Sequence, residues 1–153
     1  LYSMPVCALL VGIKALWMQF DPALASHALF EPTIEFAAGN FTWGAYFAAM
    51  GVYALTCPLQ EFGARTGLQA LLDQFAPSER GGVNWTAIVV SNLIFASAHT
   101  HIGFPFAVAA FLPGLFWGWL FARRRSLVGV SVAHAVVGIF ALFVLGVQPI
   151  IMR

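Results

Sequence analysis

Ionisable side chains interrupt three otherwise apolar stretches of this sequence, and they are of the types that move protons. Glu61 and Arg65 lie in LQEFGARTGLQALL, His99 lies in SNLIFASAHTHIGF, and His134 lies in LVGVSVAHAVVGIFALFVL. An ionisable group at membrane depth costs several kcal/mol unless it faces a partner or water. A carboxylate in such a low-dielectric pocket holds a proton more tightly than in water, so it can accept one from a water molecule. These residues therefore predict one shared polar pocket inside a helical bundle.

The composition indicates an integral membrane protein. Of the 153 residues, 61% are hydrophobic and only 8% are charged, whereas a soluble domain carries about 25% charged residues. The net charge of +1 and the lack of a basic stripe with interleaved aromatic residues argue against nucleic acid as a partner. Cys7 and Cys57 do not have the spacing of a metal or redox motif, so we expect them to be small packing residues.

We expect an all-α fold, a polytopic transmembrane bundle of about five helices, because a membrane helix needs about 20 apolar residues. The expected crossings are residues 1–20, 41–75, 85–101, 106–121 and 127–147. Pro58 is expected to bend or break the second of these. Residues 21–40 are expected to form a loop with a short interfacial helix, and residues 76–84 a turn. We expect residues 1–153 to be a single membrane domain cut from a longer chain, with the motifs in about 58–147.

Basic residues predict the orientation of the chain in the membrane. Five of the seven Lys and Arg residues lie in or near the connections 76–84 and 122–126, namely Arg65, Arg80, Arg123, Arg124 and Arg125. Two crossings separate these connections, so both are expected on the same side, and the positive-inside rule makes that side cytoplasmic. An aromatic belt is expected at this interface, formed by Trp85, Trp117 and Trp119.

The helical rise allows the depths of the polar residues to be compared. At 1.5 Å per residue, Glu61 lies roughly 20 Å before the 76–84 turn and His99 roughly 22 Å after it. His134 lies roughly 14 Å from the 122–126 turn, and helix tilt covers the difference. The spacing therefore permits, without requiring, one cluster at a single depth.

Three short motifs follow one another along residues 58–138. The first is QEFGAR, the second is IFASAH with Phe95 and His99, and the third is the block FLPGLFWGWLFARRRSLVGVSVAHAVVG. They resemble the EExxxR motif, the FxxxH motif and the closing glycine-rich helix, basic turn and HxxxN of a known family. This is the CAAX prenyl protease and bacteriocin-processing (CPBP, or Abi) family of intramembrane glutamic endopeptidases.

The resemblance implies an intramembrane protease that needs no metal or other cofactor and cleaves membrane-associated or lipidated proteins, in a bacterial inner membrane. In that family the first Glu of EExxxR acts as general base on a water molecule, and the His of FxxxH assists it. The last His and Asn hold the oxyanion, where neutral donors lower the barrier. Carried over residue by residue, the match covers Glu61, Arg65, Phe95, His99 and His134.

Two positions depart from the family pattern, because Gln60 stands at the first Glu and Gly138 at the closing Asn. Either Glu61 takes the role of the base, or the chain is a variant with altered or lost catalysis. Asn92, on the helix face of His99, is a candidate for the missing amide. The alternatives to an endopeptidase are a catalytically impaired binding or scaffold protein on the same fold, and a metal-dependent hydrolase that uses His99, His101 and His134.

Overall fold

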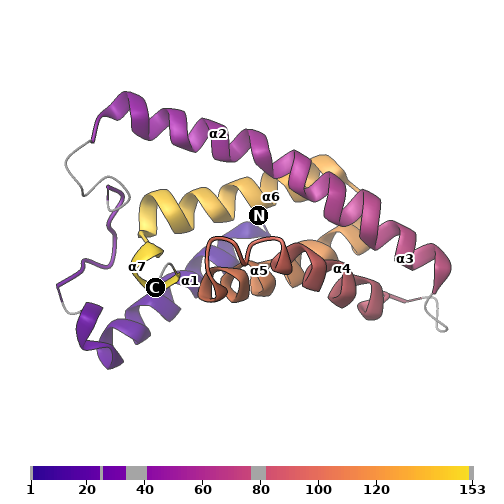
Figure 1. The fold of residues 1–153 in the computed structure, drawn as a ribbon, viewed down its shortest axis with the longest axis horizontal. Coiled ribbons are helices and arrows are strands. Elements are labelled where there is room, and N and C mark those ends of the chain that lie inside the picture. The colour runs from indigo at the N-terminus through magenta and orange to yellow at the C-terminus, as the bar shows by residue number, and fades with distance from the viewer. Residues whose placement is uncertain (1, 25, 34–40, 77–81, 152–153) are drawn as a thin grey trace.

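The structure is a computed structural model that describes residues 2–24, 26–33, 41–76 and 82–151, and within these the chain is helical, without strands. Its elements are α1 (Ser3–Phe20), the 3₁₀ helix η1 (Pro22–Leu24), α2 (Trp43–Glu61), the π-helix η3 (Phe62–Gln69), α3 (Ala70–Phe75), α4 (Trp85–Ser97), α5 (Phe104–Arg124), α6 (Leu127–Ile139), the π-helix η4 (Phe140–Leu145) and α7 (Gln148–Ile151). In Figure 1, α2, η3 and α3 form one long rod, with α6 packed along α2 and α4 returning beside η3. The predicted all-α bundle is confirmed.

The side chains are distributed as in a protein surrounded by lipid. Large apolar side chains lie on the outside, such as Phe75 at 81% exposed and Phe20 at 78%, while Glu61 and Arg65 are completely buried. Three helices are long and apolar enough to cross a membrane, namely α1, α5 and the helix that α6 forms with η4. The apolar α4 has 13 residues, about 20 Å, which is shorter than the hydrocarbon core of about 30 Å. Three of the five expected crossings therefore meet the requirement on length and composition.

Short polar side chains define where three of the helices begin. The N-caps are Thr42 for α2, Asn84 for α4 and Ser126 for α6, and each side-chain oxygen accepts a backbone N–H three residues further on at 3.1 Å. Each cap satisfies an N–H group that has no partner within its helix. The three caps thus fix the starts of the helices that carry Glu61, Asn92 and His134.

Of the bend or break predicted at Pro58, the break is wrong. Pro58 lies inside α2, which runs on to Glu61, and the chain stays helical through η3 and α3. A proline removes one hydrogen bond of the helical ladder. Here the chain changes to π-helical hydrogen bonding from Phe62 onwards instead of ending, and such π segments occur often at functional sites.

The predicted end of the helix over residues 85–101 is also wrong. The α4 helix ends at Ser97 rather than at residue 101, so His99 and His101 lie in the turn that follows. Their ring nitrogens donate to the carbonyls of Phe95 and Ala98, at 2.8 and 2.7 Å. These carbonyls belong to the last turn of the helix, where no backbone N–H remains to bond them. The side chains therefore close the helix early.

The end of α3 lies beside the basic turn that follows α5, on the side where the charge pattern places the connection 76–84; Arg80 of that connection lies outside the described residues. Arg125, which ends α5 in a left-handed conformation, forms an ion pair with Asp73 of α3. Trp85 is 54% exposed at the start of α4, but Trp117 is only 4% exposed. The prediction that Trp117 belongs to an interfacial belt is wrong, because it lies on the face of α5 that packs against α6.

A buried lysine attaches α1 to the end of η4. Lys14 Nζ donates to the carbonyl oxygens of Leu145 and Gly146, at 2.6 and 2.9 Å. These carbonyls end a helix and lack helical partners, and a cation is favourable at this pole of the helix dipole. The charge of Lys14 inside an apolar helix therefore has a structural function.

Candidate active site

The centre of the candidate site is a contact between Glu61, at the end of α2, and His134, in the middle of α6. His134 Nδ1 lies 2.7 Å from Glu61 Oε1, and the side chains are 5% and 0% exposed. A carboxylate only accepts hydrogen bonds, so the imidazole donates from Nδ1. This fixes the tautomer and leaves Nε2 with its lone pair, in the pattern of carboxylate–histidine pairs that handle protons.

The second carboxylate oxygen of Glu61 accepts a hydrogen bond from the guanidinium of Arg65, which is itself fully buried. Arg65 Nε donates to Glu61 Oε2 at 2.8 Å. The other nitrogens of the guanidinium reach Gln69 Oε1 at 3.3 Å, Asn92 Oδ1 at 3.4 Å and the Gly114 carbonyl at 3.0 Å. The predicted pair at i, i+4 is present, and it is part of a network that joins η3, α4 and α5.

Two glycines of α5 make room for this network. A Cβ atom at Gly114 would overlap the side chain of Asn92, and one at Gly118 would lie 2.8 Å from Ile88 Cγ2. Gln69 Nε2 donates to the Gly118 carbonyl at 2.9 Å. Glycines four residues apart let helices approach closely inside a membrane. Here they let α5 supply backbone carbonyls to the polar side chains of η3.

Aromatic rings enclose the imidazole of His134. Trp117 stacks on it, with ring centroids 3.8 Å apart and planes at 19°. Tyr53 and Phe95 meet it edge to face, with centroids at 6.0 and 6.2 Å. The rings hold the imidazole in one plane, so that Nδ1 stays aimed at Glu61.

His99 joins the site only through Phe95. Its ring lies 4.6 Å from the Phe95 ring, and it also stacks on Phe106 at 5.8 Å. Its Nδ1 is occupied by the Phe95 carbonyl, and within the described residues it contacts neither Glu61 nor His134. The structure thus brings Glu61, Arg65, Asn92, Phe95 and His134 together and places His99 beside the cluster.

The remaining predicted residues are placed as follows. Gln60 is half-buried and makes no hydrogen bond to the described residues, whereas its neighbour Glu61 faces the interior. Asn92 donates to the Phe111 carbonyl at 2.6 Å and accepts from Arg65, so it serves the network. Gly138 is buried one helical turn beyond His134. No group of three His, Cys, Asp or Glu side chains in the described parts of the chain could hold a metal ion.

Three residues of the site were not predicted from the sequence to belong to it: Tyr53, Gln69 and Trp117. The first two lie in steps of four from Glu61 and Arg65, which is the spacing of one helix face. Trp117 lies eight residues before Arg125, and His134 lies nine after it. In two antiparallel helices joined at that turn, these distances place the two rings at the same depth.

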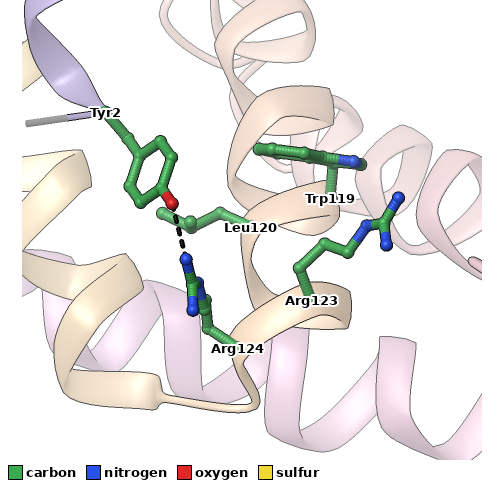
Figure 2. Close-up of a pocket in the computed structure, with 5 residues that line it drawn as sticks. All are labelled: Tyr2, Trp119, Leu120, Arg123 and Arg124. Carbon is green, nitrogen blue, oxygen red and sulfur yellow. Dashed lines mark hydrogen bonds between the residues drawn. The ribbon is translucent and has the colours of Figure 1, made fainter.

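A separate cavity of about 310 Å³ lies at the basic end of α5, away from the candidate site. Figure 2 shows its lining, in which Arg124 Nη2 donates to the Tyr2 hydroxyl at 2.5 Å, and Trp119, Leu120 and Arg123 complete the wall. The guanidinium of Arg123 makes no ion pair with the described residues. This cavity has the chemistry of a membrane–water interface, where cations and amphipathic rings collect.

Fold and site together define an integral membrane protein of helices with a buried acid–imidazole centre. The family model for type II CAAX prenyl endopeptidase Rce1-like proteins matches residues 42–140, well over half of the chain. The match includes all the helices that supply the Glu61–His134 centre. No curated protein and no solved structure is significantly similar to the chain. The chain belongs to the type II CAAX prenyl endopeptidase Rce1-like family and is a CAAX protease-like membrane protein.

Proposed function

We propose that this protein is an intramembrane endopeptidase that hydrolyses a peptide bond in membrane-associated or lipidated proteins. The observation that carries the proposal is the buried contact of 2.7 Å between Glu61 and His134. Two ionisable groups on different helices are held together there, at an energetic cost that membrane proteins accept mainly at functional sites. The proposed location is a bacterial inner membrane, from the short loops and the prokaryotic branch that the sequence resembles.

In the proposed mechanism His134 is the immediate proton acceptor. Each oxygen of Glu61 already accepts a hydrogen bond, one from His134 and one from Arg65, and the side chain is completely buried, so we assign the proton transfer from water to His134. The Nε2 lone pair of His134 takes a proton from a water molecule as the water oxygen attacks the peptide carbonyl. The C–N bond then breaks and the proton passes to the leaving amine. Glu61 holds the tautomer and stabilises the imidazolium.

His99 is proposed to support this step from the other side of Phe95. Its Nδ1 is held by the Phe95 carbonyl, which leaves Nε2 to hydrogen-bond to substrate or to water. Its half-buried position at the end of α4 is open to a substrate in a way that the completely buried Glu61 is not. The family resemblance assigns the same residue an assisting role.

The test is cleavage of a prenylated reporter peptide by the purified protein in proteoliposomes. Glu61→Gln keeps the shape of the side chain and its hydrogen bond to His134, but it removes the charge. We expect Glu61→Gln and His134→Ala each to lower kcat by about 100-fold or more, the usual contribution of a general base. The matched control is Gln60→Ala, on the same helix, with an expected change below about 2-fold. Loss of activity in Gln60→Ala with full activity in Glu61→Gln would refute this assignment of the carboxylate.

The second candidate is a catalytically impaired binding protein on the same fold. It is favoured by Gln60, which stands where the family motif has a glutamate. This candidate predicts that no member of a panel of membrane-associated peptides is cut, and that a partner protein co-purifies equally well with the wild type and with His99→Ala. Cleavage of any peptide that depends on His134 decides against it.

A further inference from the structure

The hydroxyl of Tyr53 lies directly on the backbone of Gly138. Tyr53 belongs to α2 and Gly138 to α6, and a Cβ atom at position 138 would overlap the Tyr53 hydroxyl and ring. Every residue other than glycine would therefore push the phenol out of this place. The pair is a fitted contact between the two helices that carry Glu61 and His134.

The phenol is also a neighbour of the catalytic pair. The Tyr53 ring meets the His134 ring edge to face at 6.0 Å, and Glu61 is among its electrostatic neighbours. The thiol of Cys57, one helical turn further along α2, is a polar side-chain neighbour of the phenol. A thiol is a weak acceptor, so the O–H group keeps most of its donor capacity. Tyr53 as a residue is half-buried rather than completely enclosed.

We propose that Tyr53 is a catalytic residue whose O–H donates to the carbonyl oxygen of the peptide bond being cleaved. This inference rests on the proposed endopeptidase function. As water adds to the carbonyl carbon, the oxygen gains negative charge, and a fixed donor beside it stabilises the transition state more than the substrate. Two of the other polar side chains near His134 are committed, Arg65 to four oxygens and Asn92 to Arg65 and Phe111. The buried Trp117 indole N–H and Ser131 hydroxyl have no hydrogen-bond partner among the described residues.

The main test is Tyr53→Phe, which keeps the ring and removes only the hydroxyl. We expect kcat on the reporter peptide to fall by about 100-fold, the usual effect of losing one oxyanion donor, with KM unchanged within about 3-fold. The thermal midpoint is expected to stay within about 2 °C of the wild type, since a lone hydroxyl changes stability little. The matched control is Tyr46→Phe on the same helix, because the Tyr46 hydroxyl donates to the Phe143 carbonyl away from His134. This control is expected to keep wild-type kcat.

A second pair of variants separates a donor from a merely structural contact. Tyr53→Ala removes the phenol, and adding Gly138→Asn places a neutral amide donor in the vacated space. We expect the double variant to have a kcat at least 10-fold above Tyr53→Ala. A Tyr53→Phe protein with kcat within 3-fold of the wild type overturns the role of Tyr53, and leaves the endopeptidase standing if Glu61→Gln is inactive. A wild-type protein that cleaves nothing overturns both.

Discussion

Replacing Arg65 with methionine should unfold this protein at a markedly lower temperature. The guanidinium is completely buried and bonds four oxygens, from Glu61, Gln69, Asn92 and Gly114. Methionine fills the space of the aliphatic part of the side chain but donates to none of them. The perturbation therefore leaves a buried carboxylate without its cation and removes the guanidinium hydrogen bonds to three further oxygens.

The expected size follows from the burial of the ion pair. Removing one partner of a buried pair costs about 3–5 kcal/mol, because the other charge stays in a low-dielectric interior. Domains are stable by only about 5–15 kcal/mol. For a chain of this length, 1 kcal/mol shifts the thermal midpoint by about 2–4 °C. We therefore expect Arg65→Met to lower the midpoint by about 6–20 °C.

The assay is the tryptophan fluorescence of the purified protein, heated at a fixed rate in one detergent. The control is the double variant Glu61→Gln with Arg65→Met, which removes both charges and should recover a large part of the loss. The two single variants and the double variant together give the coupling energy of the pair. If Arg65→Met melts within about 2 °C of the wild type, Arg65 is not a buried partner of Glu61, and the proposed site loses its charge balance.

Two further predictions concern close packing and lipid. Gly114→Ala should lower stability by about 1–3 kcal/mol, because the new methyl group displaces Asn92. The control is Gly51→Ala in α2, where a Cβ atom meets nothing within 4 Å, and it should be neutral or stabilising in the same melting assay. Equal thermal midpoints of the two variants would contradict the close packing of α5. The cavity in Figure 2 should take the phosphate of an anionic lipid, so phosphatidylglycerol should raise the thermal midpoint of the wild type but not of Arg123→Gln with Arg124→Gln. An equal effect of phosphatidylglycerol on both proteins would show that the cavity is not the site of binding.

Depth along the helices was the most productive argument from the sequence. The constant rise of 1.5 Å places Glu61 and His134 at comparable depth although they are 73 residues apart, and the structure joins them at 2.7 Å. The pair of Glu61 and Arg65 also follows from spacing alone, since i, i+4 side chains share a face. What spacing cannot give is the rotation of a helix about its own axis or where the helix ends. The helix before His99 ends at Ser97, so His99 lies beside the cluster that the spacing permits.

For Trp117, the preference of the residue type and the geometry of the helix lead to different predictions. Tryptophan near a basic turn suggested an interfacial belt, a statistical preference of the residue type. The rise rule, applied to the same residue, gives about 12 Å from the turn for Trp117 and about 14 Å for His134. The helical rise therefore predicts that Trp117 and His134 lie at the same depth, whereas the preference of tryptophan for interfaces led to the wrong prediction. For Tyr53 the signal was weaker, because a fit against Gly138 depends on the packing of two helices that no local pattern encodes.

Charge balance explains how Glu61 alone, without a second carboxylate at position 60, could serve the proposed proton transfer. Glu61 and Arg65 neutralise each other, and among the described residues the site contains no further ionised side chain in contact with them. In the proposed mechanism, the positive charge on His134 would form 2.7 Å from Glu61 and would be stabilised without any movement. A second carboxylate at Gln60 would lie about 100° away around the helix and would add a charge that no cation in the described interior offsets. The glutamine at this position is therefore compatible with a pocket in which Glu61 and His134 work as one unit.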